Sequence, residues 1–196
     1  AVLEKIPDYQ VFLTVDEMDA LVRERAEAHP GAMEVMTIGH SRAGHPILCA
    51  KMGSGAKNAL CFACPHPNEP IGAMTVLTMQ ELFLQDPALL EETGLTWHFI
   101  HCIDPDGTRL NEGWFKGPFS LRHYAKNYFR PAGKDQVEWT FPIDYKGLLF
   151  DRPIPETRAL MGLIDAIRPA FTFSLHNAGF GGVYWYSTDG DPALCA

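Results

Sequence analysis

The sequence predicts an α/β protein, a three-layer α/β/α sandwich in which helices cover both faces of a mixed, mainly buried β-sheet. Three observations support this fold class. Helical periods alternate with extended runs, the extended run at residues 59–64 is apolar throughout, and a composition of 46% hydrophobic and 20% charged residues can fill an ordinary core. Strands that are buried on both faces read as continuous apolar runs, so we expect the sheet to lie between helices.

The first helix is expected over residues 14–28. Thr14 and Glu17 have the spacing of a capping box, and the apolar residues after them recur with a helical period. Pro30 and Gly31 then end the pattern. The strands of the sheet are therefore expected to follow this helix.

The next extended runs are expected to form most of the sheet. Residues 33–38 and 47–52 are joined by a turn that contains glycine, which predicts a hairpin. Residues 59–64 and 95–103 are mainly apolar and read as buried central strands. The hairpin and the central strands together indicate a mixed sheet.

Two further helices and two further extended runs complete the pattern. Residues 71–85 and 155–167 have helical spacing, and residues 170–175 and 182–186 are extended runs. Residues 104–153, which precede the helix at 155–167, are rich in glycine, proline and aromatic residues. Long loops in a compact domain usually carry function, so residues there are expected to line a site.

The overall composition argues against two kinds of partner. The formal net charge is -8 and no basic cluster is visible, so we expect no nucleic-acid partner. No window reaches the roughly 18 apolar residues of a membrane span, and the N-terminus lacks the layout of a signal peptide, so we expect no membrane partner. A single globular domain over residues 1–196 is expected.

Cysteine usage indicates the compartment. The five cysteines are an odd number, and their spacings suggest no disulfide framework. Reduced thiols and a cytoplasmic setting are therefore expected. A mature secreted form from which the leader has been removed is the alternative.

A candidate metal site follows two of the expected strands. His66 and Glu69 lie between a buried strand and the next helix, and His176 follows the apolar run at residues 171–175. Ligands commonly gather at the carboxyl ends of strands in α/β sheets, so neighbouring strands would bring the three residues together. Two histidines and one carboxylate are a known catalytic ligand set for zinc, and this set leaves a fourth position open for water and substrate.

The same residues have plainer interpretations. His66 alone could be a loop histidine, and His176 alone a hydrogen-bonded core histidine. His98 and His101 are three positions apart in an expected strand, where this spacing directs side chains to opposite faces, so we interpret them as structural. The metal hypothesis therefore depends on the combination of His66, Glu69 and His176.

The residues around the candidate site resemble the M14 family of zinc carboxypeptidases. The metal motif of that family is a histidine, two variable residues and a glutamate, with a second histidine far downstream. Residues 38–47 resemble the family's first hairpin turn, and residues 104–107 resemble its Asn/Asp-Pro-Asp-Gly turn. Residues 174–176 and 182–186 resemble the strand that carries the third ligand and its neighbour. The matches keep the family's order and cover about residues 33–187.

The resemblance implies a zinc-dependent hydrolase of the metallocarboxypeptidase type, which cleaves a C-terminal peptide bond or a related amide. One Zn²⁺ per chain would be held by His66, Glu69 and His176, and it would polarise the scissile carbonyl and activate water. The implied partner is a peptide or an amino-acid-derived small substrate with a free carboxylate. The alternatives are an N-acyl amino acid deacylase on the same scaffold and a non-catalytic zinc- or peptide-binding module.

Substrate contacts are also implied by the resemblance. The family holds the terminal carboxylate of its substrate with an arginine and an Asn-Arg pair, because a guanidinium matches a carboxylate bidentately. Asn127 is the best match here, with Arg122 and Arg130 as the candidate arginines, although Tyr128 stands where the second member of the pair would be arginine. For both arginines, a solvated charge or a salt bridge across the loop is the alternative.

The resemblance is incomplete at the catalytic base. In the family the base is a glutamate on a late strand, and no glutamate follows His176 in this sequence. Asp189 and Asp191 follow it, but turn chemistry explains their surroundings. We therefore expect a chain that is incomplete at its C-terminus, with weak activity or none, because a positioned acid or base contributes roughly 100-fold to 10,000-fold in rate.

Overall fold

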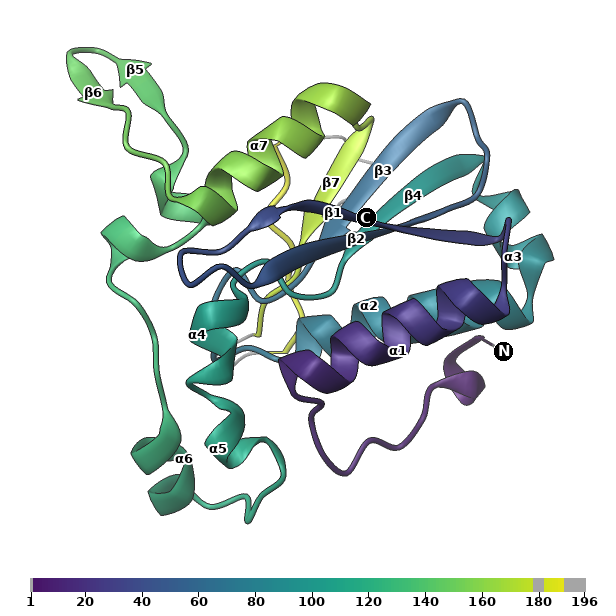
Figure 1. Cartoon of the computed structure of the whole chain (residues 1–196), viewed down its shortest axis with the longest axis horizontal. Coiled ribbons are helices and arrows are strands. Elements are labelled where there is room, and N and C mark those ends of the chain that lie inside the picture. Colours follow the sequence, from purple (N-terminus) through teal and green to yellow (C-terminus); the bar gives the residue numbers. More distant parts are fainter. Residues whose placement is uncertain (1, 178–181, 189–196) are drawn as a thin grey trace.

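The centre of the protein is a mixed five-stranded sheet, shown in Figure 1, and the computed structural model describes residues 2–177 and 182–188. The strand order is β1-β2-β4-β3-β7. Neighbours are antiparallel from β1 to β4 and parallel from β4 to β7. The strands span Met33–His40 (β1), Pro46–Met52 (β2), Lys57–Phe62 (β3), Leu95–Ile100 (β4) and Phe171–Ser174 (β7).

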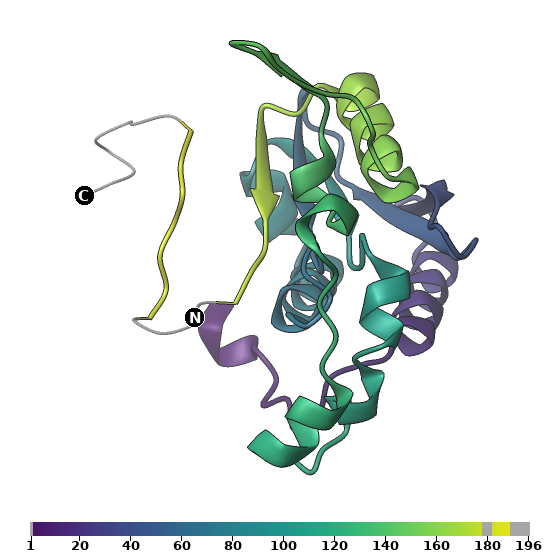
Figure 2. The same ribbon diagram turned by 90° about the vertical axis from the view of Figure 1, so that its left-hand side faces the viewer.

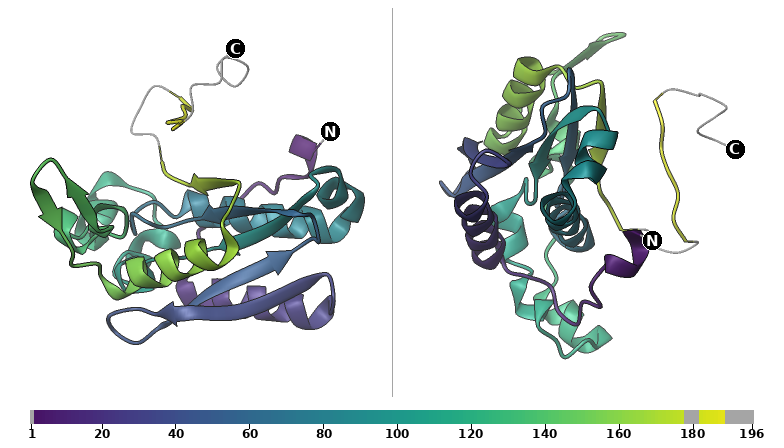
Figure 3. Two further views of the ribbon diagram at one scale, coloured as in Figure 1. Left: turned by 90° about the horizontal axis from the view of Figure 1, so that it is seen from above. Right: turned by 90° about the vertical axis from the view of Figure 1, so that its right-hand side faces the viewer.

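Helices cover both faces of this sheet, as Figure 1 and the view from above in Figure 3 show. One face carries α1 (Val15–Ala28) and α2 (Ile71–Gln85), with the short α3 (Pro87–Glu92) beside α2. The other face carries α7 (Pro155–Ile167). The predicted α/β/α sandwich is therefore confirmed. None of the described helices is long and apolar enough to cross a membrane.

Helix α1 begins where its capping box predicts. The backbone N–H of Glu17 donates to Thr14 Oγ1, and the backbone N–H of Thr14 donates to Glu17 Oε2 at 2.8 Å. Val15, Met18 and Val22 recur with a helical period and are buried against the sheet. Full burial of such side chains contributes about 1.5–3 kcal/mol each, so one apolar stripe holds the helix in place.

The central strands bury both of their faces. Leu60 packs in the core beneath α7, whereas its neighbour Cys61 packs in the core beneath α1 and α2. Phe99 and Ile100 in β4 alternate in the same way. Successive side chains of a strand point to opposite faces, so a strand with helices on both sides needs the continuous apolar run that the sequence contains.

The parallel strands end at one edge of the sheet. In the register of the sheet, Phe62 of β3 lies beside both Ile100 of β4 and Ser174 of β7. Strands β3 and β4 end at these residues, before the predicted ends at 64 and 103. At Cys64 the backbone has φ 55°, a left-handed conformation that turns the chain out of the ladder. The loops that follow β3, β4 and β7 therefore meet at this edge.

The predicted long loop, residues 104–153, contains short elements. These are α4 (Pro105–Arg109), α5 (Glu112–Phe115), α6 (Leu121–Asn127), the 3-10 turns Gly133–Asp135 and Glu138–Thr140, and a hairpin of β5 (Ile143–Tyr145) and β6 (Leu148–Phe150). The predicted turn at residues 104–107 is the start of α4, where the Asp104 side chain accepts from the backbone N–H of Gly107. Helical periodicity does not reveal helices this short.

The extended run expected at residues 182–186 is not a strand. Residues 182–188 belong to neither sheet of the described structure, and Val183, Trp185 and Tyr186 are exposed. Figure 2 shows this segment, drawn in yellow, away from the layered body. A run of β-favouring residues forms a strand only where a neighbouring strand completes its backbone hydrogen bonds.

Candidate metal centre

The candidate metal centre lies at the carboxyl ends of β3 and β7. His66 and Glu69 are in the loop between β3 and α2, and His176 follows β7. The start of α2 packs closely against this end of β7, because a Cβ at Gly72 would lie 2.9 Å from Leu175 Cβ. The fold therefore brings together the three residues that the sequence predicts as ligands.

The three predicted ligand atoms form a nearly equilateral triangle. His66 Nδ1 lies 3.1 Å from Glu69 Oε2, and His176 Nδ1 lies 3.0 Å from each of these atoms. Hydrogen bonds cannot satisfy all three sides, because protons on both ring nitrogens would serve the carboxylate but would then face each other. Three lone pairs directed at one cation satisfy the whole triangle. These separations are slightly shorter than the roughly 3.3–3.6 Å between tetrahedral ligands that lie about 2.0–2.2 Å from a zinc ion.

The charges at the centre are strongly coupled. Burial raises the pKa of Glu69, but hydrogen bonds with His176 and His66 outweigh burial and hold the pKa below its usual range. Hydrogen bonds to Glu138 and then to Glu69 raise the pKa of His176 to about 9. Without a metal, His176 is therefore protonated on both ring nitrogens near neutral pH. Zinc binds neutral imidazole, so metal binding at this centre would release one of these protons.

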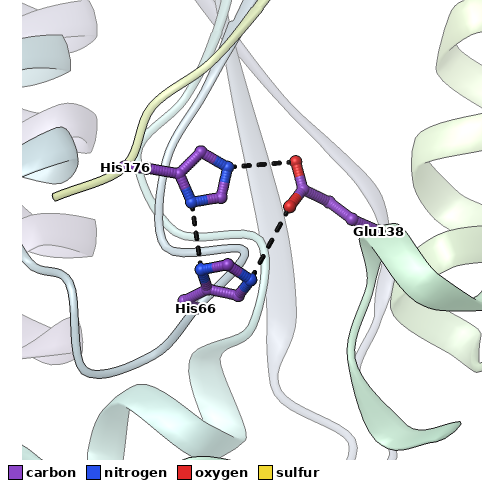
Figure 4. A group of neighbouring side chains, drawn as sticks. All are labelled: His66, Glu138 and His176. Atoms are coloured by element: carbon purple, nitrogen blue, oxygen red, sulfur yellow. Dashed lines mark hydrogen bonds and ion pairs between the residues drawn. The ribbon is translucent and has the colours of Figure 1, made fainter. Parts of the chain in front are cut away.

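Glu138 is a site residue that the sequence interpretation missed. Its Oε1 lies 3.2 Å from His176 Nε2, and its Oε2 lies 3.8 Å from His66 Nε2. Figure 4 shows that it faces the two rings on the side opposite their Nδ1 atoms. The only signal in the sequence is its place in the long aromatic stretch, because no motif or spacing links it to either histidine.

The histidines could therefore hold a cation on either of two sides. His66, Glu138 and His176 offer one ligand atom each within 4.8 Å of one another. On the other side, the predicted triangle with Glu69 has separations of 3.0–3.1 Å. The side chain of Glu69 is also less exposed than that of Glu138, at 10% against 28%. Geometry and burial both favour the triangle with Glu69.

The three residues that are predicted to contact substrate lie in three different surroundings. Arg130 Nη1 donates to Glu69 Oε1 at 3.0 Å, so Arg130 lies at the centre. The side-chain amide of Asn127 donates to the backbone carbonyl of His123 within α6. Arg122 is exposed on α6 and makes no hydrogen bond or ion pair with the ligand triangle in the described structure. Their predicted role in substrate binding stays a prediction.

Two aspartates follow His176 in the sequence. Asp189 and Asp191 lie outside the described residues. Among the residues that the structure describes, Glu69 and Glu138 are the carboxylates that contact the two histidines. Both face ring nitrogens.

Comparisons with solved structures show which proteins share this fold. Carboxypeptidase A from Helicoverpa armigera is 17% identical, with a TM-score of 0.62, over 86% of this chain and 46% of its own. Bovine thrombin-activatable fibrinolysis inhibitor is 15% identical, with a TM-score of 0.63, over 93% of this chain and 68% of its own. A metallo-carboxypeptidase from Burkholderia cenocepacia is 18% identical, with a TM-score of 0.58, over 85% and 41%.

At these identities the likeness shows the fold. The chain spans less than half of the length of the insect and Burkholderia carboxypeptidases. No curated protein sequence matches the chain significantly. The sequence model of zinc carboxypeptidases, in contrast, matches residues 18–193, a range that includes His66, Glu69 and His176. The chain therefore belongs to the zinc carboxypeptidase family.

Proposed function

We propose that this protein is a zinc-dependent hydrolase of the metallocarboxypeptidase type, which cleaves a C-terminal peptide bond or a related amide. One observation carries the proposal: a chain of the zinc carboxypeptidase family holds His66, Glu69 and His176 in a triangle that hydrogen bonds alone cannot satisfy. Zinc, when bound there, would supply a Lewis acid that polarises a carbonyl group and lowers the pKa of water.

The exposure of the triangle supports a catalytic rather than a purely structural site. The His176 side chain is 32% exposed, whereas those of His66 and Glu69 are 13% and 10% exposed. Three protein ligands leave one position of a tetrahedral zinc site open. We propose that substrate enters from the side of His176.

The proposed binding site for the substrate carboxylate lies beside Arg130. Arg130 borders a cavity of about 340 Å³, which Arg42 and the carboxylates Asp106 and Asp135 also line. A free carboxylate is the group that guanidinium side chains recognise best. We propose a peptide or an amino-acid-derived substrate with a free carboxylate. An N-acyl amino acid would carry the same group, so a deacylase is the rival within this reaction class.

Proton transfer is expected to limit the reaction in this chain. Glu69 is a proposed ligand, and Glu138 faces the Nε2 atoms of the rings, on the side away from the triangle. Neither carboxylate of the described structure is therefore placed to take a proton from a nucleophile at the open position. With Glu69 and Glu138 as the only carboxylates of the described residues at the centre, we expect turnover roughly 100-fold to 10,000-fold below that of an enzyme with a positioned base.

The proposal can be tested by measuring metal content and turnover together. Protein purified without chelator should contain about one zinc per chain, and His66→Ala should contain almost none. Slow release of the last residue should be detected from peptides with a free C-terminus and not from their amidated counterparts. Faster cleavage of N-acyl amino acids would favour the deacylase, and stoichiometric zinc without any turnover would favour a binding module. Far less than one zinc per chain would overturn the site.

We propose a cytoplasmic setting from the state of the cysteines that the structure describes. Cys49, Cys61, Cys64 and Cys102 are free and buried. Burial also raises the pKa of the Cys49 and Cys61 thiols to about 12, which makes them unreactive. Localisation of the tagged protein in its native cell would test this setting.

A further inference from the structure

The proposed metal ligand Glu69 has a different partner on each carboxylate oxygen. Oε2 faces His66 and His176, whereas Oε1 accepts a hydrogen bond from Arg130 Nη1 at 3.0 Å. The Arg130 side chain is 30% exposed and also lies 3.5 Å from Asn68 Oδ1. A guanidinium on Oε1 holds the orientation of the carboxylate, so that Oε2 faces the two histidines, and Oε2 also accepts a hydrogen bond from the backbone N–H of Asn177 at 3.3 Å.

His176 also has different partners on its two ring nitrogens. Nδ1 faces the ligand triangle, and Nε2 lies 3.2 Å from Glu138 Oε1, which also accepts a hydrogen bond from Ser174 Oγ. The other oxygen of Glu138 faces His66 Nε2, a buried atom that has no hydrogen-bond partner. A carboxylate behind an imidazole keeps the proton on Nε2, and so directs the lone pair of Nδ1 towards the metal.

Arg130 and Glu138 belong to one segment, and packing sets its position. Val137 is fully buried, and its backbone carbonyl accepts a hydrogen bond from Thr157 Oγ1 of α7 at 2.9 Å. Arg42 Nη2 donates to the backbone carbonyl of Asp135 at 3.3 Å. The two charged side chains therefore reach the centre from a backbone that is anchored to α7 and to the turn after β1.

We propose that residues 130–138 form an outer clamp on the metal ligands, in which Arg130 positions Glu69 and Glu138 positions His176. Neither residue is a ligand in this arrangement. The clamp places positive charge on the ligand carboxylate and negative charge on the ligand imidazole, so each ligand is held with its donor atom turned towards the triangle. The inference rests on the proposed zinc function.

Zinc affinity is the most direct test of the clamp. The variants Arg130→Gln and Glu138→Gln remove one charge each, and Arg23→Gln and Glu34→Gln are matched controls on exposed residues away from the centre. Competition with a chelator should show that each clamp variant binds zinc roughly 10-fold to 100-fold more weakly than wild type. The controls should stay within about twofold of wild type, since surface substitutions of this kind have small effects.

Two further measurements separate positioning from a general structural effect. Thermal unfolding of the metal-free proteins shows whether each variant folds. In the cobalt-substituted proteins, the visible absorption bands should shift in Glu138→Gln, because the donor strength of His176 changes. The conservative variants Glu138→Asp and Arg130→Lys should recover part of the lost affinity.

Each outcome decides between the clamp and the proposed function. If wild type binds no zinc, the proposed function fails and the clamp fails with it. If wild type binds zinc, His66→Ala does not, and both clamp variants bind as tightly as wild type, the clamp alone is wrong. If Glu138→Gln abolishes binding while Glu69→Gln retains it, Glu138 is itself a ligand and the clamp is overturned.

Discussion

Two pairs of histidines lie in or next to the sheet, and they differ in how they share their partners. His98 Nε2 is hydrogen bonded to Asn58 Oδ1 at 3.0 Å, and His101 Nε2 to Asp19 Oδ1 at 2.7 Å. His66 and His176 instead share the carboxylates of Glu69 and Glu138, and their Nδ1 atoms lie 3.0 Å apart. His98 and His101 each have a partner of their own at Nε2, whereas the buried Nδ1 of each has no hydrogen-bond partner in the described structure. Two histidines that share a carboxylate and face each other need a cation.

Removing a shared histidine should have the largest effect on metal binding. His66→Ala and His176→Ala each delete one of three proposed ligands, and the loss should exceed the roughly 100-fold that removal of an outer partner causes. Zinc should also raise the melting temperature of wild type, because a ligand that binds the folded state stabilises it. Titration with zinc under thermal unfolding measures both effects. If zinc raised the melting temperature of wild type and of either variant equally, the proposed difference between the two pairs of histidines would be wrong.

Removing a histidine with its own partner should lower the stability of the fold and leave zinc affinity unchanged. His101 is 1% exposed, so His101→Ala leaves a cavity and an unpaired Asp19, and should destabilise the fold by about 2–4 kcal/mol. Zinc affinity of the folded protein should be unchanged. Urea unfolding with chelator present measures the stability, and His40→Ala, at an exposed position, is the control. A loss of zinc in His101→Ala would contradict the structural assignment.

Asp104 extends the comparison to a buried carboxylate that is poorly matched by its surroundings. Burial raises its pKa from 3.8 to about 6. Its contribution to stability is thus fully present below about pH 4, is lost as the pH rises through 6, and stays lost at pH 7. Asp104→Asn keeps the acceptor for Gly107, and should be about 1–3 kcal/mol more stable than wild type at pH 7, with little difference at pH 4. Urea unfolding at both pH values measures this, and a pH-independent difference would show that the charge is not the cause.

The smallest expected effect concerns His98. Burial and then Lys51 lower its pKa in the folded state. The stability that neutral His98 contributes is present above the ordinary histidine pKa of 6.5 and is lost as the pH falls through the lowered value. His98→Gln should therefore lose less stability on acidification than wild type does. Parallel acid-unfolding curves for the two proteins would show that His98 does not titrate with unfolding.

Local pattern predicted the regular elements and the ligands. The helices at residues 14–28, 71–85 and 155–167 lie within a residue of their predicted bounds, because helical periods and caps are encoded by neighbouring residues. The spacing of His66 and Glu69 is likewise local. His176 was predicted because it follows an apolar run, and the parallel pairing of β3 with β7 brings it to the same edge.

The sequence by itself thus determined the fold class, the family and the three proposed ligands. Only the tertiary structure decided which charged side chains contact those ligands. Glu138 is 38 positions from His176, and Arg130 is 61 positions from Glu69, so neither pair leaves a periodic signal. Their contacts depend on how Val137 packs beneath α7 and on which way the loop backbone turns. Long-range packing therefore sets the electrostatic surroundings of the centre, whereas short-range pattern sets its donor atoms.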